Sequence, residues 1–253
     1  MVPFLWACST VFNFNKMEKR TIIIYGASQG LGRYYFSKLE INPIYKVIGI
    51  SRKRPQWTEA HHHWITADLS EPLKAREAVL EKLRNTPLDV LIYNVGIWED
   101  RAFERDYSFL NDDPTHLETM INTNITSCIF QIQALLPKLL DSTKSQIILT
   151  GSTSALDNTG RPEVTFNASK FALRGIAQSL RSSFKDKNLS VTLINPGYID
   201  TENKHSTAET LSIHNGKQIP MEDLWMILNT ILNLSPAICP LEITLPSMKD
   251  NEV

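Results

Sequence analysis

The stretch Thr21-Ile-Ile-Ile-Tyr25-Gly26-Ala-Ser-Gln-Gly30-Leu-Gly32 decides the fold of this chain. Its first half is apolar and rich in isoleucine, which predicts a buried strand, and the glycine-rich turn after it opens a helix. Glycines there allow a tight turn and let backbone N–H groups approach a phosphate at the helix N-terminus. A plain turn would also explain the glycines, but the strand–turn–helix context favours a dinucleotide site.

Short apolar runs recur along the chain and alternate with amphipathic segments. Buried parallel strands have this composition, and helices commonly connect them. We therefore predict an α/β fold, a Rossmann-like doubly wound parallel sheet with helices on both faces, in a single domain. Two long segments after strand ends, Ile97–Asp113 and Tyr198–Gln218, are predicted to be functional loops. The predicted strands are Thr21–Tyr25, Lys46–Ile50, Val90–Tyr93, Gln146–Thr150 and Ser190–Ile194, and the predicted helices include Glu71–Arg84 and Leu117–Leu140.

Bulk properties exclude several classes of function. A chain of 253 residues with 42% hydrophobic content can bury one substantial core, and its net charge of −1 argues against nucleic acid as a partner. The cysteines (Cys8, Cys128 and Cys239) form no zinc or disulfide pattern and fit a reducing compartment. Side chains of the run His61–His63 should point apart on an extended segment, so we predict no metal site.

The N-terminus is predicted to be separate from the domain. Residues 1–16 are interpreted as an extension, and the folded domain is expected to span residues 17–253, starting at Met17. The apolar residues 2–14 are too short to cross a bilayer and lack the features of a secretory signal. No other segment is long and apolar enough for a membrane helix, so we expect a cytoplasmic protein without a membrane partner.

The end of the second predicted strand indicates the form of the dinucleotide. A site for NAD usually places an acidic residue there, whereas this chain carries Ser51-Arg52-Lys53-Arg54. Guanidinium groups can clamp a 2′-phosphate that a carboxylate would repel. Most basic runs are solvated loops, but the position of this run favours NADP(H), with Arg52 as the first candidate.

From about Thr21 to Pro246 the chain resembles the single-domain short-chain dehydrogenase/reductase family. The glycine-rich turn is similar to the family's TGxxxGxG, with Tyr25 replacing threonine. Residues 67–69 (ADL), 93–96 (YNVG) and 195–201 (NPGYIDT) are similar to three further motifs in the family's order. The resemblance implies that NADP(H) is bound by Gly26, Ser28, Gln29, Gly30, Leu31, Gly32, Ser51, Arg52, Asp68, Leu69, Asn94, Gly96, Lys170, Pro196, Gly197, Ile199 and Thr201.

The family's catalytic residues are matched with one exception. Phe166-Asn-Ala-Ser-Lys170 has the spacing of the family's Tyr-x-x-x-Lys pair, so Phe166 stands where the resemblance implies a phenol that transfers a proton. Lys170 and Asn124 match the catalytic lysine and asparagine. Ser152 is the first choice for the catalytic serine, with Thr153 and Ser154 as alternatives. In such enzymes hydride transfer is coupled to general acid–base catalysis.

Three explanations for Phe166 remain open: a disabled variant, an enzyme whose chemistry needs no phenol, or a protein that binds NADPH without turning it over. Reduction of a cationic iminium needs no proton in the hydride step. A proton could otherwise come from Tyr107, Tyr198 or His205 in the two loops. The leading prediction is an NADP-dependent reductase, impaired or atypical, that acts on a carbonyl or imine of a small organic substrate. The alternative is a non-catalytic NADP(H)-binding or scaffold protein.

The resemblance also implies a homodimer or homotetramer. Family members commonly pair through two long helices, here about Leu117–Leu140 and Val164–Lys185, and through the C-terminal strand near Cys239–Leu245. Amphipathic periodicity alone does not separate this arrangement from helices that pack only on their own sheet.

Overall fold

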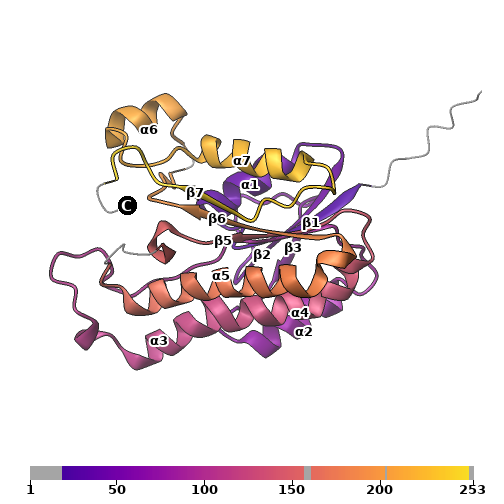
Figure 1. Cartoon of the computed structure of the whole chain (residues 1–253), viewed down its shortest axis with the longest axis horizontal. Coiled ribbons are helices and arrows are strands. Elements are labelled where there is room, and N and C mark those ends of the chain that lie inside the picture. The colour runs from indigo at the N-terminus through magenta and orange to yellow at the C-terminus, as the bar shows by residue number, and fades with distance from the viewer. Residues whose placement is uncertain (1–18, 157–160, 203, 251–253) are drawn as a thin grey trace, which may run out of the picture.

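A computed structural model describes residues 19–156, 161–202 and 204–250. Its centre is one sheet of seven parallel strands in the order β3-β2-β1-β4-β5-β6-β7 (Figure 1). The strand order reverses between β1 and β4, which is the topological switch point where such sheets bind ligands. The predicted Rossmann-like single domain is therefore confirmed. The strands are β1 (Arg20–Tyr25), β2 (Tyr45–Ser51), β3 (His63–Thr66), β4 (Val90–Tyr93), β5 (Ser145–Thr150), β6 (Leu189–Pro196) and β7 (Glu242–Leu245).

Helices cover both faces of the sheet (Figure 1). Alternate residues of a strand point to opposite faces, so Ile22 and Ile24 of β1 pack with α1 (Gly30–Glu40) and α7 (Met221–Asn233). Ile23 and Tyr25 belong to the second core, which includes residues of the helices on the opposite face. Those helices are α2 (Pro72–Lys82), α4 (Ser127–Leu140) and α5 (Val164–Phe184).

The predicted helix Leu117–Leu140 has three parts. It starts earlier, as α3 (Pro114–Ile121), because Pro114 suits the first helical turn and Asp113 accepts the N–H of Thr115 at the N-cap. A π-helical turn, η2 (Asn122–Thr126), then joins α3 to α4. π-Turns of this kind are frequent at functional sites, and this one carries a predicted catalytic residue.

The loop predicted over Tyr198–Gln218 contains a helix, α6 (Thr207–His214). Ser206 accepts the N–H of Glu209, and the Glu209 carboxylate accepts the N–H of Ser206, which forms a complete capping box. This capping box marks the N-terminus of α6, although the polar composition of the segment suggested a loop. The loop Ile97–Asp113 holds only a 3₁₀ turn, η1 (Phe109–Asn111). Two further 3₁₀ turns, η3 (Thr153–Ala155) and η4 (Lys185–Lys187), flank α5.

The histidine run does not behave as predicted. Only His63 is in a strand, and the rings of His61 and His62 lie 4.3 Å apart. Because the chain turns before β3, both side chains approach the same carboxylate, that of Glu40. The expectation that adjacent histidines point apart was therefore wrong at this turn.

Other sequence-based expectations fall partly outside the described residues. The proposed extension at residues 1–16, the start at Met17 and Cys8 all lie there. Cys128 and Cys239 are free thiols. Across residues 19–156, 161–202 and 204–250, no helix has the length and apolar character needed to cross a membrane.

Candidate active site

The glycine-rich turn lies at the switch point, between the ends of β1 and β4. Gly26 has φ +77°, and a Cβ atom there would lie 2.3 Å from the carbonyl oxygen of Asn94. A Cβ at Gly32 would lie 2.1 Å from the carbonyl oxygen of Gly26. Side chains are thus excluded at both positions, because the turn passes very close to the first turn of α1 and to the end of β4.

The N-terminus of α1 is open to a ligand. Gln29 is the N-cap residue, yet no side chain caps the helix. The first N–H groups of such a helix have no partner within the helix, so they can bind a phosphate. Gly30 has φ +51°, and a Cβ there would lie 3.5 Å from Thr201. The predicted residues Gly30 and Thr201 therefore lie next to each other at this helix N-terminus, directly after Gln29.

Trp57 belongs to this region although sequence reasoning missed it. Its indole N–H donates to the carbonyl oxygen of Ser28 at 3.0 Å, and the guanidinium of Arg33 lies 4.9 Å from its ring centroid. Trp57 sits in a Pro-Gln-Trp-Thr segment without regular structure. Only the fold brings this segment beside the glycine-rich turn, so the sequence offered no local signal.

The two arginines of the basic run after β2, Arg52 and Arg54, differ in their contacts. Arg54 is engaged in its own loop, since it donates to Thr58, to the Glu59 carbonyl and to the His62 carbonyl. Arg52 is exposed, and no hydrogen bond or ion pair to another described residue engages it. Ser51, at the end of β2, donates to the Lys53 carbonyl. Arg52 is therefore the arginine of this run that is available to a ligand.

Two residues predicted to bind the cofactor, Asp68 and Leu69, follow β3. Asp68 is exposed and accepts hydrogen bonds from the N–H and hydroxyl of Ser70, so its carboxylate is already held in a local turn. Leu69 is buried, and its carbonyl accepts the hydroxyl of Ser127 at 2.6 Å. Leu69 thus lies against the start of α4.

Lys170 is the central charged group at the carboxyl end of the sheet. It is buried, and its Nζ donates to the carbonyl of Thr150 at 3.0 Å and to that of Val95 at 3.4 Å. Burial lowers the pKa of Lys170 to about 8. A Cβ at Gly96 would lie 3.0 Å from Nζ, so Gly96 leaves room for the amine. The amine thereby links the ends of β4 and β5.

Phe166 lies directly beside this amine. The Nζ of Lys170 lies 5.3 Å from the centroid of the Phe166 ring, and Trp98 packs edge-on against that ring at 5.9 Å. The N–H of Phe166 donates to a carboxylate oxygen of Glu99 at 3.1 Å, and so does that of Thr165 at 2.9 Å. Sequence reasoning missed Glu99, whose buried carboxylate fixes the start of α5 and so the position of the ring.

Asn124 is held rigidly in the π-turn between α3 and α4. Its amide accepts the N–H of Ile97 at 2.9 Å and donates to the Ile97 carbonyl at 2.8 Å. It also donates to the hydroxyl of Ser169, the neighbour of Lys170, at 3.1 Å. The structure thus brings together Asn124, Phe166 and Lys170.

Ser152 follows β5 by two residues, at the same edge of the sheet. Its hydroxyl accepts the N–H of Ser154 and lies 3.0 Å from the Ser154 hydroxyl. Thr153 and Ser154 are buried, whereas Ser152 is only half-buried. Ser152 is therefore the more accessible of the three hydroxyls.

The segment after β6 closes the site from the other side. The N–H of Gly197 bonds to the Leu245 carbonyl at the end of β7, which continues the sheet beyond Pro196. Ile199 forms an isolated parallel bridge with Ile219. The segment therefore runs from the end of β6 to Thr201 at the glycine-rich turn.

Two of the candidate proton donors, Tyr107 and His205, contact carboxylates in their own loops. Tyr107 donates to Asp112 at 2.7 Å, and burial together with this carboxylate raises the pKa of Tyr107. His205 lies 2.8 Å from Asp200. Burial alone would raise the pKa of Asp200, but hydrogen bonds from Thr210 and His205 lower it overall.

Tyr198 is connected to Phe166 through a series of ring contacts. Its ring lies 6.1 Å from Phe103, which lies 5.9 Å from Trp98, the residue that packs on Phe166. Phe103 has φ +74°, an uncommon conformation for a bulky residue, and such strain concentrates at functional sites. Arg161 donates to the Tyr198 hydroxyl at 2.8 Å.

Known proteins share this architecture. The short chain dehydrogenase pattern matches residues 20–212. The 3-oxoacyl-(acyl-carrier-protein) reductase FabG of Buchnera aphidicola subsp. Schizaphis graminum is 27% identical over 198 residues, which cover 74% of this chain and 76% of that protein. Its name describes an oxidoreductase.

Two solved structures have the same fold. One is a 3-ketoacyl-(acyl-carrier-protein) reductase from Brucella melitensis complexed with NADH, with TM-score 0.75, 17% identity, and coverage of 90% of this chain and 97% of that one. The other is ElxO with one tyrosine changed to phenylalanine and NADPH bound, with TM-score 0.71, 22% identity, and coverage of 89% and 96%. The matching pattern spans most of the chain, and the chain therefore belongs to the short chain dehydrogenase family.

Proposed function

We propose that this protein is an NADP(H)-dependent oxidoreductase that reduces a carbonyl or imine of a small organic molecule. The observation that carries the proposal is the buried amine of Lys170, which lies beside the Phe166 ring and Gly96 at the sheet edge where the glycine-rich turn opens. Burial of a charged amine costs folding free energy. Groups whose pKa is perturbed by burial cluster at functional sites, which favours a functional role for Lys170.

When bound, a nicotinamide cofactor would supply the hydride. The proposed roles of the protein are to bind and orient that cofactor. Gly26 and Gly32 permit the tight turn that leads into α1, whose N-terminus would bind the pyrophosphate, and Lys170 would hold the nicotinamide ribose. Arg52, exposed and free of other described partners, would bind the 2′-phosphate that distinguishes NADPH from NADH.

The missing hydroxyl of Phe166 is the reason to propose a cationic iminium as the preferred substrate. Hydride addition to an iminium carbon gives a neutral amine without proton transfer, so no phenol is required in that step. Aromatic faces attract cations, and Trp98 and Phe103 are each about half exposed beside Phe166. The buried carboxylate of Glu163 accepts the N–H of Phe103 at 3.3 Å, which adds negative charge nearby.

The alternative is a protein that binds NADP(H) and does not turn it over. The missing hydroxyl of Phe166 favours this alternative, because loss of a general acid removes transition-state stabilisation and leaves binding of the cofactor largely intact. A structurally similar protein, ElxO with one tyrosine changed to phenylalanine, has NADPH bound.

Titration of NADPH and NADH against the protein tests the cofactor. We expect NADPH to bind more tightly, and Arg52→Ala to weaken NADPH binding by roughly tenfold to a hundredfold, since a hydrogen bond to a charged group contributes about 1.5–3 kcal/mol. NADH binding should not change. Arg54→Ala is the matched control, because Arg54 is engaged in its own loop. Equal or tighter binding of NADH by the unmodified chain contradicts the role of Arg52.

Turnover by the unmodified chain and by Phe166→Tyr tests the reaction. We expect the unmodified chain to reduce cyclic iminium substrates, and Phe166→Tyr to gain reduction of ketones by roughly 100- to 10,000-fold, the range that general acid catalysis supplies. A protein that binds NADPH but is inactive with both substrate classes in both forms is the non-catalytic alternative.

Tyr198→Phe tests the remaining candidate donor in the unmodified chain. If Tyr198 supplies a proton, this variant loses any ketone reduction while its NADPH affinity stays the same. Activity that survives the substitution excludes Tyr198. Tyr107→Phe is the comparison variant, since Asp112 already accepts the Tyr107 hydroxyl.

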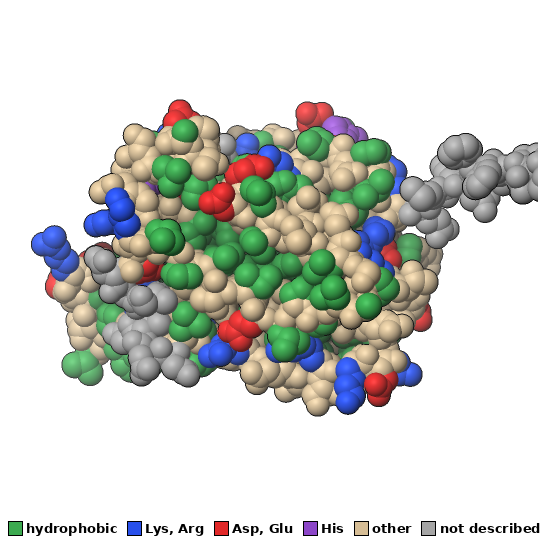
Figure 2. Space-filling view, turned by 45° about the horizontal axis from the view of Figure 1, so that its top comes forward, with side chains coloured by type: hydrophobic (Ala, Val, Ile, Leu, Met, Phe, Trp, Pro, Cys, Tyr) green, Lys and Arg blue, Asp and Glu red, His purple; other side chains and the backbone are tan. Residues whose placement is uncertain are grey.

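We also propose a homodimer or homotetramer. Exposed apolar side chains lie on the two long helices, including Ile129 of α4 and Phe171 of α5. Figure 2 shows hydrophobic side chains gathered across the face that presents β7, an edge strand that follows the exposed residues Ile238 and Leu241. Sedimentation analysis of the chain and of Phe171→Asp tests this proposal, and a monomer in both cases refutes it.

A further inference from the structure

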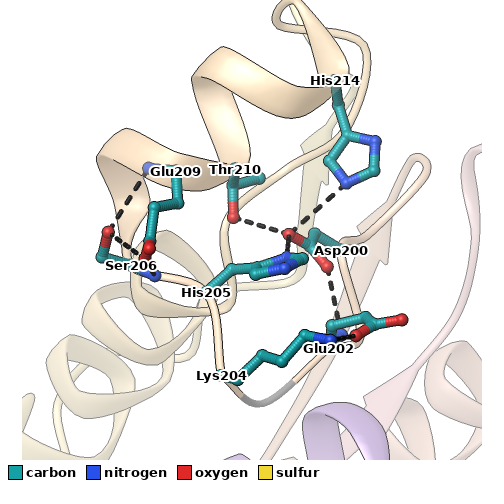
Figure 3. Close-up of polar contacts among 8 residues, drawn as sticks. All are labelled: Asp200, Glu202, Lys204, His205, Ser206, Glu209, Thr210 and His214. Atoms are coloured by element: carbon teal, nitrogen blue, oxygen red, sulfur yellow. Dashed lines mark hydrogen bonds and ion pairs between the residues drawn. The ribbon is translucent and has the colours of Figure 1, made fainter.

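Three side chains that can bind a metal converge in the loop after β6. The carboxylate of Asp200 is 2% exposed, and its Oδ2 lies 2.8 Å from Nδ1 of His205 and 3.5 Å from Nε2 of His214. Figure 3 shows both imidazole rings directed toward that carboxylate, His205 from just before α6 and His214 from the last residue of α6. The three residues come from separate parts of the segment, so their sequence spacing matches no metal motif.

The spacing of the three atoms suits a tetrahedral ion. They lie within 4.8 Å of one another. Zn²⁺ bound at about 2.0–2.2 Å to nitrogen and oxygen places its ligand atoms about 3.3 Å apart in a tetrahedron. The two measured separations from Asp200 lie on either side of that value.

Nε2 of His214 supports the site independently. This atom is buried, yet within the described chain it makes no hydrogen bond. Nε2 lies 3.5 Å from Oδ2 of Asp200, and this contact is an ion pair only if the ring is protonated. Buried polar atoms without a hydrogen bond are rare and call for an explanation. A metal ion between the ring and the carboxylate provides one.

The surroundings of Asp200 resemble the outer shell of a metal site. The hydroxyl of Thr210 donates to Oδ2 at 2.7 Å, and the N–H of Glu202 donates to Oδ1 at 3.1 Å. Hydrogen bonds of this kind orient metal-binding carboxylates. Two imidazoles with one carboxylate favour Zn²⁺ over Mg²⁺ and Ca²⁺, which prefer oxygen ligands.

We propose that Asp200, His205 and His214 form a Zn²⁺ site with one open coordination position. His205 binds through Nδ1 as the tautomer protonated at Nε2, and His214 binds through Nε2. The ion ties the segment after β6 to both ends of α6. Asp200 is next to Thr201, which faces the glycine-rich turn, so a bound ion also steadies the segment beside the proposed cofactor site.

A second group of potential ligands provides a comparison within the same chain. Glu40 lies 3.1 Å from His61 and 3.3 Å from His62. Glu40 is 28% exposed and His61 is 62% exposed, so water screens the carboxylate. Lys46 lines the same hollow and brings positive charge toward a cation. We therefore expect this group to bind Zn²⁺ much more weakly than the Asp200 site.

Calorimetric titration of the full chain with Zn²⁺, after treatment with a chelator, tests the proposal. We expect one saturable Zn²⁺ site per chain. His205→Gln and His214→Gln should each weaken binding by roughly 100-fold, and the outer-shell variant Thr210→Val by roughly tenfold. His61→Gln should leave the affinity unchanged. Mg²⁺ at the same concentration should produce no saturable heat.

His214→Gln separates metal binding from folding. Because Nε2 of His214 makes no hydrogen bond in the described structure, the metal-free variant should melt at the same temperature as the unmodified chain. Addition of Zn²⁺ should raise the melting temperature of the unmodified chain only. Equal Zn²⁺ affinity in both proteins, or no saturable binding at micromolar Zn²⁺, overturns the proposal.

Discussion

Burial of the Lys170 amine predicts a specific dependence of stability on pH. The amine is ordinarily protonated up to a pKa of 10.5, and burial lowers that pKa to about 8. Below pH 8 both the folded and unfolded chains carry the charge, so the folded chain bears the full cost of burying it. As pH rises from about 8 to 10.5, the folded chain loses its proton first, and stability increases.

The magnitude follows from the two pKa values. The gap between 10.5 and about 8, at about 1.4 kcal/mol per pKa unit, corresponds to about 3 kcal/mol in total. Between about pH 7 and about pH 10, the contribution of Lys170 to the free energy of unfolding should therefore rise by about 2.5 kcal/mol. Lys170→Met removes the titrating amine while it keeps a side chain of similar length, so this rise should be absent in the variant.

Urea unfolding of both proteins at a series of pH values provides the measurement. The other titrating groups are common to both, so their effects cancel in the difference between the two free energies. We expect that difference to change in favour of the unmodified chain as pH increases from about 7 to about 10. A difference that stays flat or changes in the opposite direction refutes the assignment of a buried, charged amine with a lowered pKa.

Three further substitutions test the local structure. Gly32→Ala places a Cβ 2.1 Å from the Gly26 carbonyl, so urea unfolding should show a loss of about 1–3 kcal/mol, and NADPH titration a loss of affinity. Ser206→Ala removes the capping box of α6 and should reduce hydrogen-exchange protection of that helix by about 1 kcal/mol. Glu99→Ala leaves two N–H groups at the start of α5 without an acceptor, including that of Phe166, and should lower the melting temperature. Unchanged values would contradict these roles.

The central strands could be predicted from the sequence because they are buried on both faces. A strand of this kind is apolar at every position, and Val90–Tyr93 was predicted with the bounds that the structure has. The outer strands were less visible. β7 is half-exposed and short, and only the resemblance pointed to it.

The site was only partly predictable, because some of its residues act through contacts between distant parts of the chain. The glycines were identified from their position between a strand and a helix, and Lys170 was identified from the resemblance to the family's motif. Trp57 and Glu99 act through contacts with residues 29 and 67 positions away. Such contacts depend on the packed fold and leave no periodic or local pattern. α6 is different, because Ser206 and Glu209 do form a readable capping signal within a polar segment.

Lys170 helps to decide whether a chain with Phe166 still has a functional cofactor site. The edge-on contact with Trp98 and the approach of the Lys170 amine need only the aromatic ring, so packing alone does not distinguish phenylalanine from tyrosine here. Packing does not explain the buried amine, because its burial costs about 3 kcal/mol and position 166 carries no phenol whose pKa the amine could lower. A remaining role is to bind the ribose of the cofactor. Lys170→Met should therefore weaken NADPH binding in the Phe166 background, and unchanged affinity would remove the main support for a functional site.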